Sequence, residues 1–146
     1  MLLQDKVAVI SGAASPRGIG LATARLFASQ GASVVILDLD ADAAHRAASQ
    51  LPPGNHIGLA CNVTSRRDCQ DACAKTIEHY GRVDVLINNA GITQPVKTLD
   101  IDPESWDRIL DVNLRGVLYL SQAFLPSMRA ARSGSIACMS SVSAQR

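Results

Sequence analysis

Aromatic residues, excess charge of either sign and long apolar runs are all scarce in this sequence. Phe, Trp and Tyr make up 3% of the 146 residues, and 14 basic residues against 13 acidic ones leave a net charge of +1. Proteins that bind nucleic acid usually present a basic surface with aromatic rings for stacking, so we expect no nucleic-acid partner. No apolar run reaches membrane-spanning length, and residues 1–6 lack the pattern of a signal peptide. We therefore expect a cytoplasmic protein without a membrane partner.

The four cysteines lack the spacing of a metal site. Cys69 and Cys73 fall on one face of a predicted helix, whereas Cys61 and Cys138 fall in predicted strands. No two of them form the paired knuckle typical of zinc sites. We expect reduced, structural thiols and no bound metal.

The sequence does contain a regular alternation of short apolar runs and longer amphipathic stretches. The apolar runs are too short for helices and indicate buried parallel strands at residues 7–10, 33–37, 57–61, 83–87 and 135–139. The amphipathic stretches indicate helices at residues 18–30, 40–51, 64–80 and 103–130. This alternation predicts an α/β fold of the Rossmann type, with a doubly wound parallel sheet and helices on both faces. The 47% hydrophobic composition suits one domain over residues 1–146.

Residues typical of helix ends support these boundaries. Gly31 stands where a helix C-cap glycine belongs, and Ser65 with Asp68 matches a capping box. Asp102 precedes a proline at the first helical position.

A glycine-rich turn follows the first predicted strand. It contains Gly12, Gly18 and Gly20, and the chain is helical from there. Unpaired backbone amides and the helix dipole at such a turn favour a pyrophosphate, and glycine lets the anion approach closely. A plain tight turn is the alternative interpretation, because glycine loops are common.

Asp38 ends the second predicted strand, where a dinucleotide-binding fold has an acidic residue on the adenosine ribose. The alternative is a solvated carboxylate before the helix that Asp40 caps. A carboxylate facing the ribose would repel a 2′-phosphate by about 4 kcal/mol per unit charge at ~4 Å and an effective dielectric of ~20. Arg17 could instead pair with that phosphate. We expect NAD as the cofactor, with NADP the less favoured.

Further motifs follow in order along the chain. Asn88-Asn89-Ala90-Gly91 ends the fourth strand, Asn113 lies in mid-helix, where asparagine is unfavourable, and Ser140-Ser141 ends the fifth strand. With the glycine turn and Asp38, this set resembles the short-chain dehydrogenase/reductase family over essentially the whole chain. The resemblance implies a sheet of strand order 3-2-1-4-5, assembly into dimers or tetramers, and hydride transfer between NAD(P) and an alcohol or carbonyl carbon of a small molecule.

The resemblance also implies roles for individual residues. Cofactor contacts are expected from the glycine turn, the end of the second strand, the segment after the third strand and the segment after the fourth: Gly12, Arg17, Gly18, Ile19, Gly20, Asp38, Leu39, Asn62, Val63, Asn89, Ala90 and Gly91. Asn62 stands where the family often has an aspartate, so its contact with the adenine would lack a carboxylate. Asn113 is implied to help bind a water of the proton relay. Ser141 is implied to be the catalytic serine that hydrogen-bonds the substrate oxygen, with Ser140 and Ser143 as alternatives.

The sequence departs from the family pattern at two places. Five residues separate Gly12 from Gly18, more than is usual in the family, so residues 15–17 are expected to form a longer loop over the phosphates. The family's catalytic Tyr-x-x-x-Lys is not found, because Tyr80 is followed at that spacing by Asp84 and Tyr119 by Ala123.

We expect the chain to stop before that tyrosine and lysine, with the family's later strands beyond Arg146. Alone it would then be inactive and would associate through the open edge of its fifth strand. Leu114, Leu118 and Leu120 would add apolar surface on the long helix. A non-catalytic nucleotide-sensing protein is the alternative function, although it would have little use for Asn113 with Ser141. The sequence has a loose similarity to 3-oxoacyl-acyl-carrier-protein reductases and does not identify the substrate.

Overall fold

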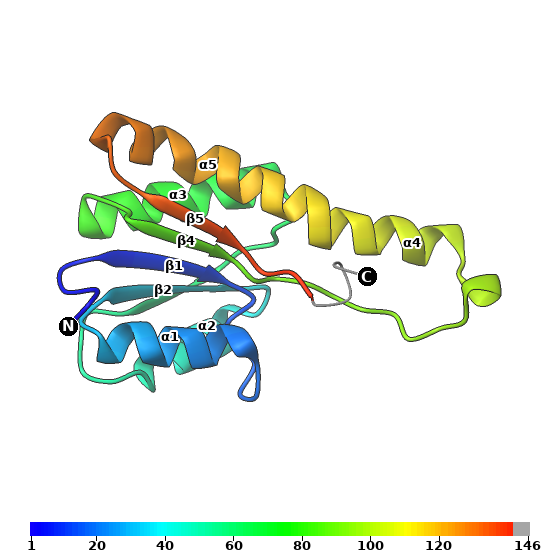
Figure 1. Ribbon diagram of the computed structural model, residues 1–146, viewed down its shortest axis with the longest axis horizontal. Coiled ribbons are helices and arrows are strands. Elements are labelled where there is room, and N and C mark those ends of the chain that lie inside the picture. The colour runs from blue at the N-terminus through cyan, green and yellow to red at the C-terminus, as the bar shows by residue number, and fades with distance from the viewer. Residues whose placement is uncertain (142–146) are drawn as a thin grey trace.

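The computed structural model describes residues 1–141, which form a parallel five-stranded sheet with helices on both faces (Figure 1). The strand order is β3-β2-β1-β4-β5. The predicted fold class and strand order are therefore confirmed. The strands are β1 (Val7–Ser11), β2 (Ser33–Asp38), β3 (Ile57–Ala60), β4 (Val85–Asn88) and β5 (Ser135–Cys138).

The helices lie in two layers (Figure 1). α1 and α2 cover one face of the sheet and α3 and α5 the other, while α4 continues the line of α5 past the strand ends. Within residues 1–141, no helix is long and apolar enough to cross a membrane. The helices are α1 (Ile19–Ser29), α2 (Ala41–Ser49), α3 (Arg66–Tyr80), α4 (Pro103–Leu110) and α5 (Gly116–Ala131), with a 3-10 turn at Thr98–Asp100.

The central strands are apolar because both of their faces are covered. All five residues of β1 are buried. Side chains alternate between faces along a strand, so Ile10 and Ile36 pack with α1 and α2, whereas Val9 and Val35 pack with α3 and α5. This two-sided burial explains the continuous apolar runs of the sequence.

The predicted helix ends have their expected chemistry. The Ser65 hydroxyl accepts from the Asp68 N–H at 3.2 Å and donates to the Asp68 carboxylate at 2.6 Å. The Asp102 carboxylate accepts from the Ser105 N–H at 2.8 Å. Gly31 follows the last residues of α1 with a φ of +91°, a conformation that favours glycine.

The predicted helix 103–130 is interrupted by a wider turn. α4 and α5 are joined without a break by a π-helical segment, Asp111–Arg115, in which the Gly116 N–H donates to the Asp111 carbonyl. Such turns insert one extra residue into a helix and often occur at functional sites. Asn113 lies in this segment.

The apolar residues of α5 divide between the core and the surface. Leu120, Phe124 and Met128 recur at helical spacing and are buried against the sheet. Leu118 of α5 is 52% exposed, and Leu114 of the preceding π-helical segment is 64% exposed. The expected surplus of apolar surface is therefore present at these two residues, whereas the expectation for Leu120 is wrong because this side chain belongs to the core.

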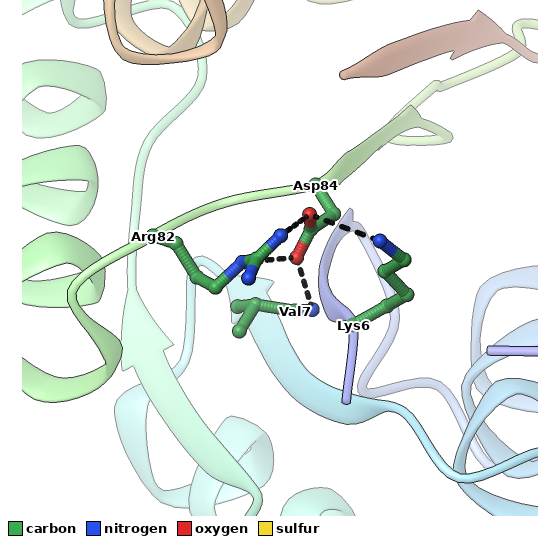
Figure 2. Close-up of polar contacts among 4 residues, drawn as sticks. All are labelled: Lys6, Val7, Arg82 and Asp84. Carbon is green, nitrogen blue, oxygen red and sulfur yellow. Dashed lines mark hydrogen bonds and ion pairs between the residues drawn. The ribbon is translucent and has the colours of Figure 1, made fainter. Parts of the chain in front are cut away.

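Asp84 joins the amino ends of β1 and β4 (Figure 2). Its carboxylate accepts from the Val7 N–H at 2.9 Å and from Arg82 Nε at 2.9 Å, and Lys6 Nζ lies 3.7 Å away. Burial alone would raise the pKa of this carboxyl. The hydrogen bonds from Arg82 and Val7 and the charges of Arg82 and Lys6 outweigh burial and hold the pKa below its usual range.

Candidate functional site

The glycine-rich turn has no room for side chains at two positions. Gly12 has a φ of +62°, and its N–H donates to the Leu37 carbonyl at 2.7 Å. A Cβ at Gly12 would lie 2.7 Å from Ala90 Cα, and a Cβ at Gly20 would lie 2.6 Å from Asn89 Nδ2. Both glycines are therefore required by the close approach of the turn to the segment that follows β4.

The predicted longer loop is a compact, exposed turn. The Gly18 N–H donates to the Ser15 carbonyl at 3.0 Å, and Pro16 occupies the second position of this turn. Arg17 and Ile19 are exposed beside it. Gly18 is the N-cap of α1 and supplies no side-chain acceptor for the first helical amides. Open amides at a helix N-terminus favour an anion.

Asp38 is held against this turn by two backbone amides. Its Oδ2 accepts from the Ala14 N–H at 3.0 Å, and its Oδ1 accepts from the Leu39 N–H at 2.9 Å. Asp38 is half-buried, whereas Leu39 is exposed. The carboxylate is thus fixed in orientation where β2 ends, and it keeps acceptor capacity because an ionised carboxylate has about four acceptor sites.

The segment after β3 presents an amide group at the same end of the sheet. Asn62 is exposed, and Val63 beside it is buried. The Asn62 side-chain oxygen accepts from the Thr64 N–H at 3.0 Å and from the Thr64 hydroxyl at 2.8 Å. Since Thr64 occupies the oxygen, Nδ2 is the atom that Asn62 offers to a ligand.

The segment after β4 is locked to the end of β1. Asn89 Nδ2 donates to the carbonyls of Ser11 and Gly12 at 2.9 and 3.0 Å. The buried Ser11 hydroxyl accepts from the backbone N–H groups of Asn89 and Ala90, each at 3.0 Å. Sequence reasoning did not select Ser11. A polar residue at the end of an otherwise apolar central strand was the signal that could have identified it.

Asn113 forms a two-way bridge to the loop that follows β4. Its Oδ1 accepts from the Ile92 N–H and its Nδ2 donates to the Ile92 carbonyl, both at 2.9 Å. This bridge gives a structural reason for an asparagine in mid-helix. It also ties the π-helical segment to Ile92, in the loop that follows β4 at the carboxyl end of the sheet.

The strand-end serines lie beyond the last pairing of β5. The Met139 N–H donates to the Asn88 carbonyl at 2.9 Å, and Ser140 and Ser141 follow as exposed residues. Ser143, the other alternative for the catalytic serine, lies outside the described residues.

A cavity of about 890 Å³ lies at the carboxyl ends of the strands. Six residues predicted to contact the cofactor line it: Gly12, Asp38, Leu39, Asn62, Val63 and Gly91. The other predicted residues, Arg17, Gly18, Ile19, Gly20, Asn89, Ala90, Asn113 and Ser141, are not among its lining. α4 and the π-helical segment supply a wall that sequence reasoning missed, formed by Glu104, Asp107, Arg108, Asp111 and Val112.

The cavity wall is acidic. Asp38, Glu104, Asp107 and Asp111 contribute four carboxylates, against one guanidinium, that of Arg108. A second positive charge lies close by, because Arg115 forms an ion pair with Asp111. The excess of negative charge disfavours the binding of a group with two negative charges at this end of the cavity.

Another hollow, of about 880 Å³, lies beside the edge strand β3. It is lined by all three histidines of the chain, His45, His56 and His79, and by none of the predicted site residues. His56 accepts from the Val34 N–H at 3.1 Å through Nδ1, and its Nε2 lies 2.9 Å from the Pro52 carbonyl. Among residues 1–141, no group of His, Cys, Asp or Glu side chains is placed to hold a metal ion.

Tyr80 is unsuited to donate a proton near neutral pH. It ends α3, and its hydroxyl donates to the Asn55 carbonyl at 3.0 Å. Burial raises the pKa of Tyr80 to about 12. The residues that follow it lead into the amino end of β4, opposite the cavity.

A sequence profile of the short chain dehydrogenases matches residues 6–146. The chain belongs to the short-chain dehydrogenase family. It is 62% identical over 149 residues to an uncharacterized short-chain type dehydrogenase/reductase of Sinorhizobium fredii, covering 100% of this chain and 59% of that protein. It is 42% identical over 145 residues to a 3-oxoacyl-[acyl-carrier-protein] reductase of Thermotoga maritima, covering 97% and 58%. It is 37% identical over 144 residues to a D-threitol dehydrogenase of Mycolicibacterium smegmatis, covering 97% and 55%.

This short-chain dehydrogenase chain therefore spans between 55% and 59% of the length of these three relatives. The matched part contains the glycine turn, the bridge between Asn113 and Ile92, and the strand-end serines. The family is one of oxidoreductases that act on small molecules.

The four cysteines form no disulfide bonds with one another.

Proposed function

We propose that this short-chain dehydrogenase binds NAD(H) in the cavity at the carboxyl ends of its strands. We further propose that the whole protein interconverts an alcohol and a ketone or aldehyde. The observation that carries the proposal is the meeting of the glycine turn, Asp38 and Gly91 around one cavity. When bound, NAD(H) would supply the hydride chemistry of this interconversion, while the proton of the alcohol oxygen would be exchanged with groups of the protein or with water.

The turn suits the pyrophosphate of a dinucleotide. The space above Gly12 and Gly20 cannot hold a Cβ, and the first amides of α1 have no side-chain cap. Ile19 would contribute its backbone amide, since the Gly18 N–H already donates to the Ser15 carbonyl, and Gly18 would let the anion approach closely. The exposed Arg17 would add a positive charge. Asn89 and Ala90 would support this cradle through Ser11 rather than by facing the open cavity.

Asp38 suits the adenosine ribose. Two N–H groups hold its carboxylate in place, and its remaining acceptor sites can receive ribose hydroxyls. A 2′-phosphate would meet this carboxylate and the acidic wall of α4. Because Arg17 and Arg108 oppose this repulsion only in part, we favour NAD over NADP. Leu39 and Val63 would flank the adenine, with Asn62 Nδ2 as a donor.

Ser141 is our candidate for the residue that hydrogen-bonds the substrate oxygen, because the end of β5 brings it to the same edge of the sheet. Asn113 would act by holding the Ile92 backbone. Its amide is already engaged there, so a relay water in this region would need other atoms besides the Asn113 Nδ2. The named relatives make a 3-oxoacyl thioester or a polyol the first substrates to try.

We also propose that residues 1–146 form one nucleotide-binding domain of a cytoplasmic homo-oligomer. For this chain alone we propose no turnover. The first statement is supported by the resemblance of its motifs to those of its family, and the second by the lack of a Tyr-x-x-x-Lys pattern in residues 1–146.

Titration with NADH and with NADPH tests the cofactor assignment directly. Trp106, the single tryptophan, lies on α4 between two residues of the cavity wall, so its energy transfer to a bound nicotinamide reports binding. We expect at least tenfold tighter binding of NADH, and Asp38→Ala should narrow the difference. Asp71→Ala is the control: it removes an exposed carboxylate of α3 and should leave the difference in affinity between NADH and NADPH unchanged. Tighter binding of NADPH, or no binding of either, would contradict the proposal.

A further inference from the structure

The hollow beside the edge strand β3 has an apolar floor. On one face of β3, α2 packs so closely that a Cβ at Gly58 would collide with the Ala44 carbonyl. On the other face, α3 makes few contacts with the strand. The side chains of Ile57 and Leu59 point to that second face, where they stay half-buried and line the hollow.

The rim of the hollow is basic. α2 contributes His45 and Arg46, α3 contributes Lys75 and His79, and Glu78 is the single carboxylate of the lining. Arg46 and Lys75 are exposed, and within residues 1–141 neither side chain forms an ion pair or a hydrogen bond. The balance of charge is thus opposite to that of the cavity at the carboxyl ends of the strands, where carboxylates dominate.

Hydrogen bonds determine what each histidine can offer to a ligand. Both ring nitrogens of His56 are engaged by backbone groups, so this ring is structural. His45 Nδ1 lies 2.8 Å from the Ala41 carbonyl, and His79 Nε2 lies 3.1 Å from the side-chain oxygen of Asn55. A ring nitrogen must carry a hydrogen to bond an oxygen acceptor, so the second nitrogen of His45 and of His79 becomes a donor when the ring gains a proton.

We propose that this hollow is a second binding site, which takes a phosphate monoester with an apolar body. The long side chains of Arg46 and Lys75, one from each helix, supply the positive charge, and the apolar body covers Ile57 and Leu59. Glu78 opposes the phosphate, whereas protonation of the two exposed histidines favours it. A volume of about 880 Å³ suits a small molecule. The site is independent of the cofactor assignment, because none of the residues predicted to contact the cofactor lines it.

Calorimetric titration of the full-length protein tests the site, with phenyl phosphate, inorganic phosphate and phenol as probes. Saturating NADH is present to occupy the glycine turn, which would otherwise also attract phosphate. We expect phenyl phosphate to bind at least about fivefold more tightly than inorganic phosphate, because its ring covers apolar side chains, and phenol to bind more weakly than either. Titrations in buffers of different ionisation enthalpy should show that phenyl phosphate binds with uptake of protons.

Substitutions on the rim and the floor separate the two contributions. Arg46→Gln combined with Lys75→Gln should weaken the binding of phenyl phosphate at least about tenfold, because hydrogen bonds to a charged group are lost. Arg25→Gln is the matched control, since it removes an exposed arginine of α1 that does not line the hollow. Ile57→Thr should reduce the preference for phenyl phosphate over inorganic phosphate. The affinity for NADH should be unchanged in all these variants.

Ring signals in NMR spectra locate the ligand without relying on heat. Phenyl phosphate should shift the signals of His45 and His79, assigned through His45→Gln and His79→Gln, much more than that of His56. Unshifted signals of His45 and His79, equal affinity for phenol, or unchanged affinity in the variant that lacks Arg46 and Lys75 would each overturn the proposal. Failure of NADH to bind would instead contradict the proposed function, and the histidine signals would then decide whether the hollow binds the phosphate.

Discussion

Asp84→Asn tests whether the amino end of the sheet is held by a buried carboxylate (Figure 2). Asp84 is 6% exposed, and its carboxylate accepts from the Val7 N–H and from Arg82. Hydrogen bonds to a charged group contribute about 1.5–3 kcal/mol. The asparagine keeps one acceptor oxygen but turns an NH₂ group toward other donors. Arg82 and Lys6 are partly exposed, so water screens their charges and limits the loss.

We therefore expect the free energy of unfolding to fall by about 2–3 kcal/mol near neutral pH. For a protein of about 150–250 residues, this corresponds to a decrease in Tm of roughly 4–12 °C. Differential scanning calorimetry of the full-length protein measures it.

The effect should depend on pH in a defined direction. The pKa of Asp84 is lowered in the folded state, so its stabilisation is fully present above the unfolded pKa of about 3.9. It is lost as the pH falls through the lower, folded pKa. The Tm difference between the unaltered protein and Asp84→Asn should thus be constant between roughly pH 5 and 7 and should shrink below about pH 4.

Asp71→Asn is the control, because Asp71 pairs with Arg67 at 3.8 Å on the exposed face of α3. Such a pair contributes about 0.5 kcal/mol or less. If Asp84→Asn lowers the free energy of unfolding by no more than Asp71→Asn does, the buried carboxylate does not hold the amino end of the sheet. A Tm difference that persists undiminished at pH 3 would lead to the same conclusion.

Three further predictions concern the carboxyl end of the sheet. Gly12→Ala should weaken NADH binding more than tenfold in the Trp106 assay, since the added Cβ meets Ala90 Cα at 2.7 Å. Unchanged affinity would contradict the proposal that the glycine turn binds the pyrophosphate. Ser141→Ala in the full-length protein should lower kcat far more than it weakens NAD binding, and unchanged turnover would show that another serine acts. The 146-residue chain alone should self-associate, because β5 is an edge strand and Leu118 is 52% exposed. Light scattering that shows a monodisperse monomer would contradict this last prediction.

Features encoded by neighbouring residues could be predicted from the sequence. The apolar runs gave the strands because burial on both faces leaves few polar positions, and the helix ends followed from Ser65, Asp102 and Gly31. Gly12 was identifiable because it lies at a fixed place between a strand and a helix. In each case the cause lies within a few residues of its effect.

Features that depend on distant segments could not be predicted. Ser11 meets Asn89 only once β1 and β4 are paired, and Asp84 meets Val7 at the other end of the same pair. The π-helical turn depends on a bridge between Asn113 and Ile92 that helix propensity does not contain. The α4 wall was missed because an exposed, charged helix face looks the same in sequence whether it faces solvent or a cavity.

The two ends of the sheet differ in how fully their polar groups are satisfied. At the amino end, several donors surround the buried carboxylate of Asp84. At the carboxyl end, the first amides of α1 have no side-chain cap, Asp38 receives only backbone amides, and Asn88 Oδ1 has no partner within residues 1–141. Unsatisfied polar groups reduce stability, so a fold can retain them only where the rest of the structure compensates. The amino end of the sheet, where several donors contact Asp84, supplies that compensation together with the two apolar layers. Parallel strands place every strand-end loop of this sheet on the same side, so the uncapped amides of α1 and the open acceptor sites of Asp38 meet at one edge, whereas Asn88 Oδ1 is buried beneath it. A ligand with several charged and hydroxyl groups satisfies such an edge far better than an apolar one, as a dinucleotide would.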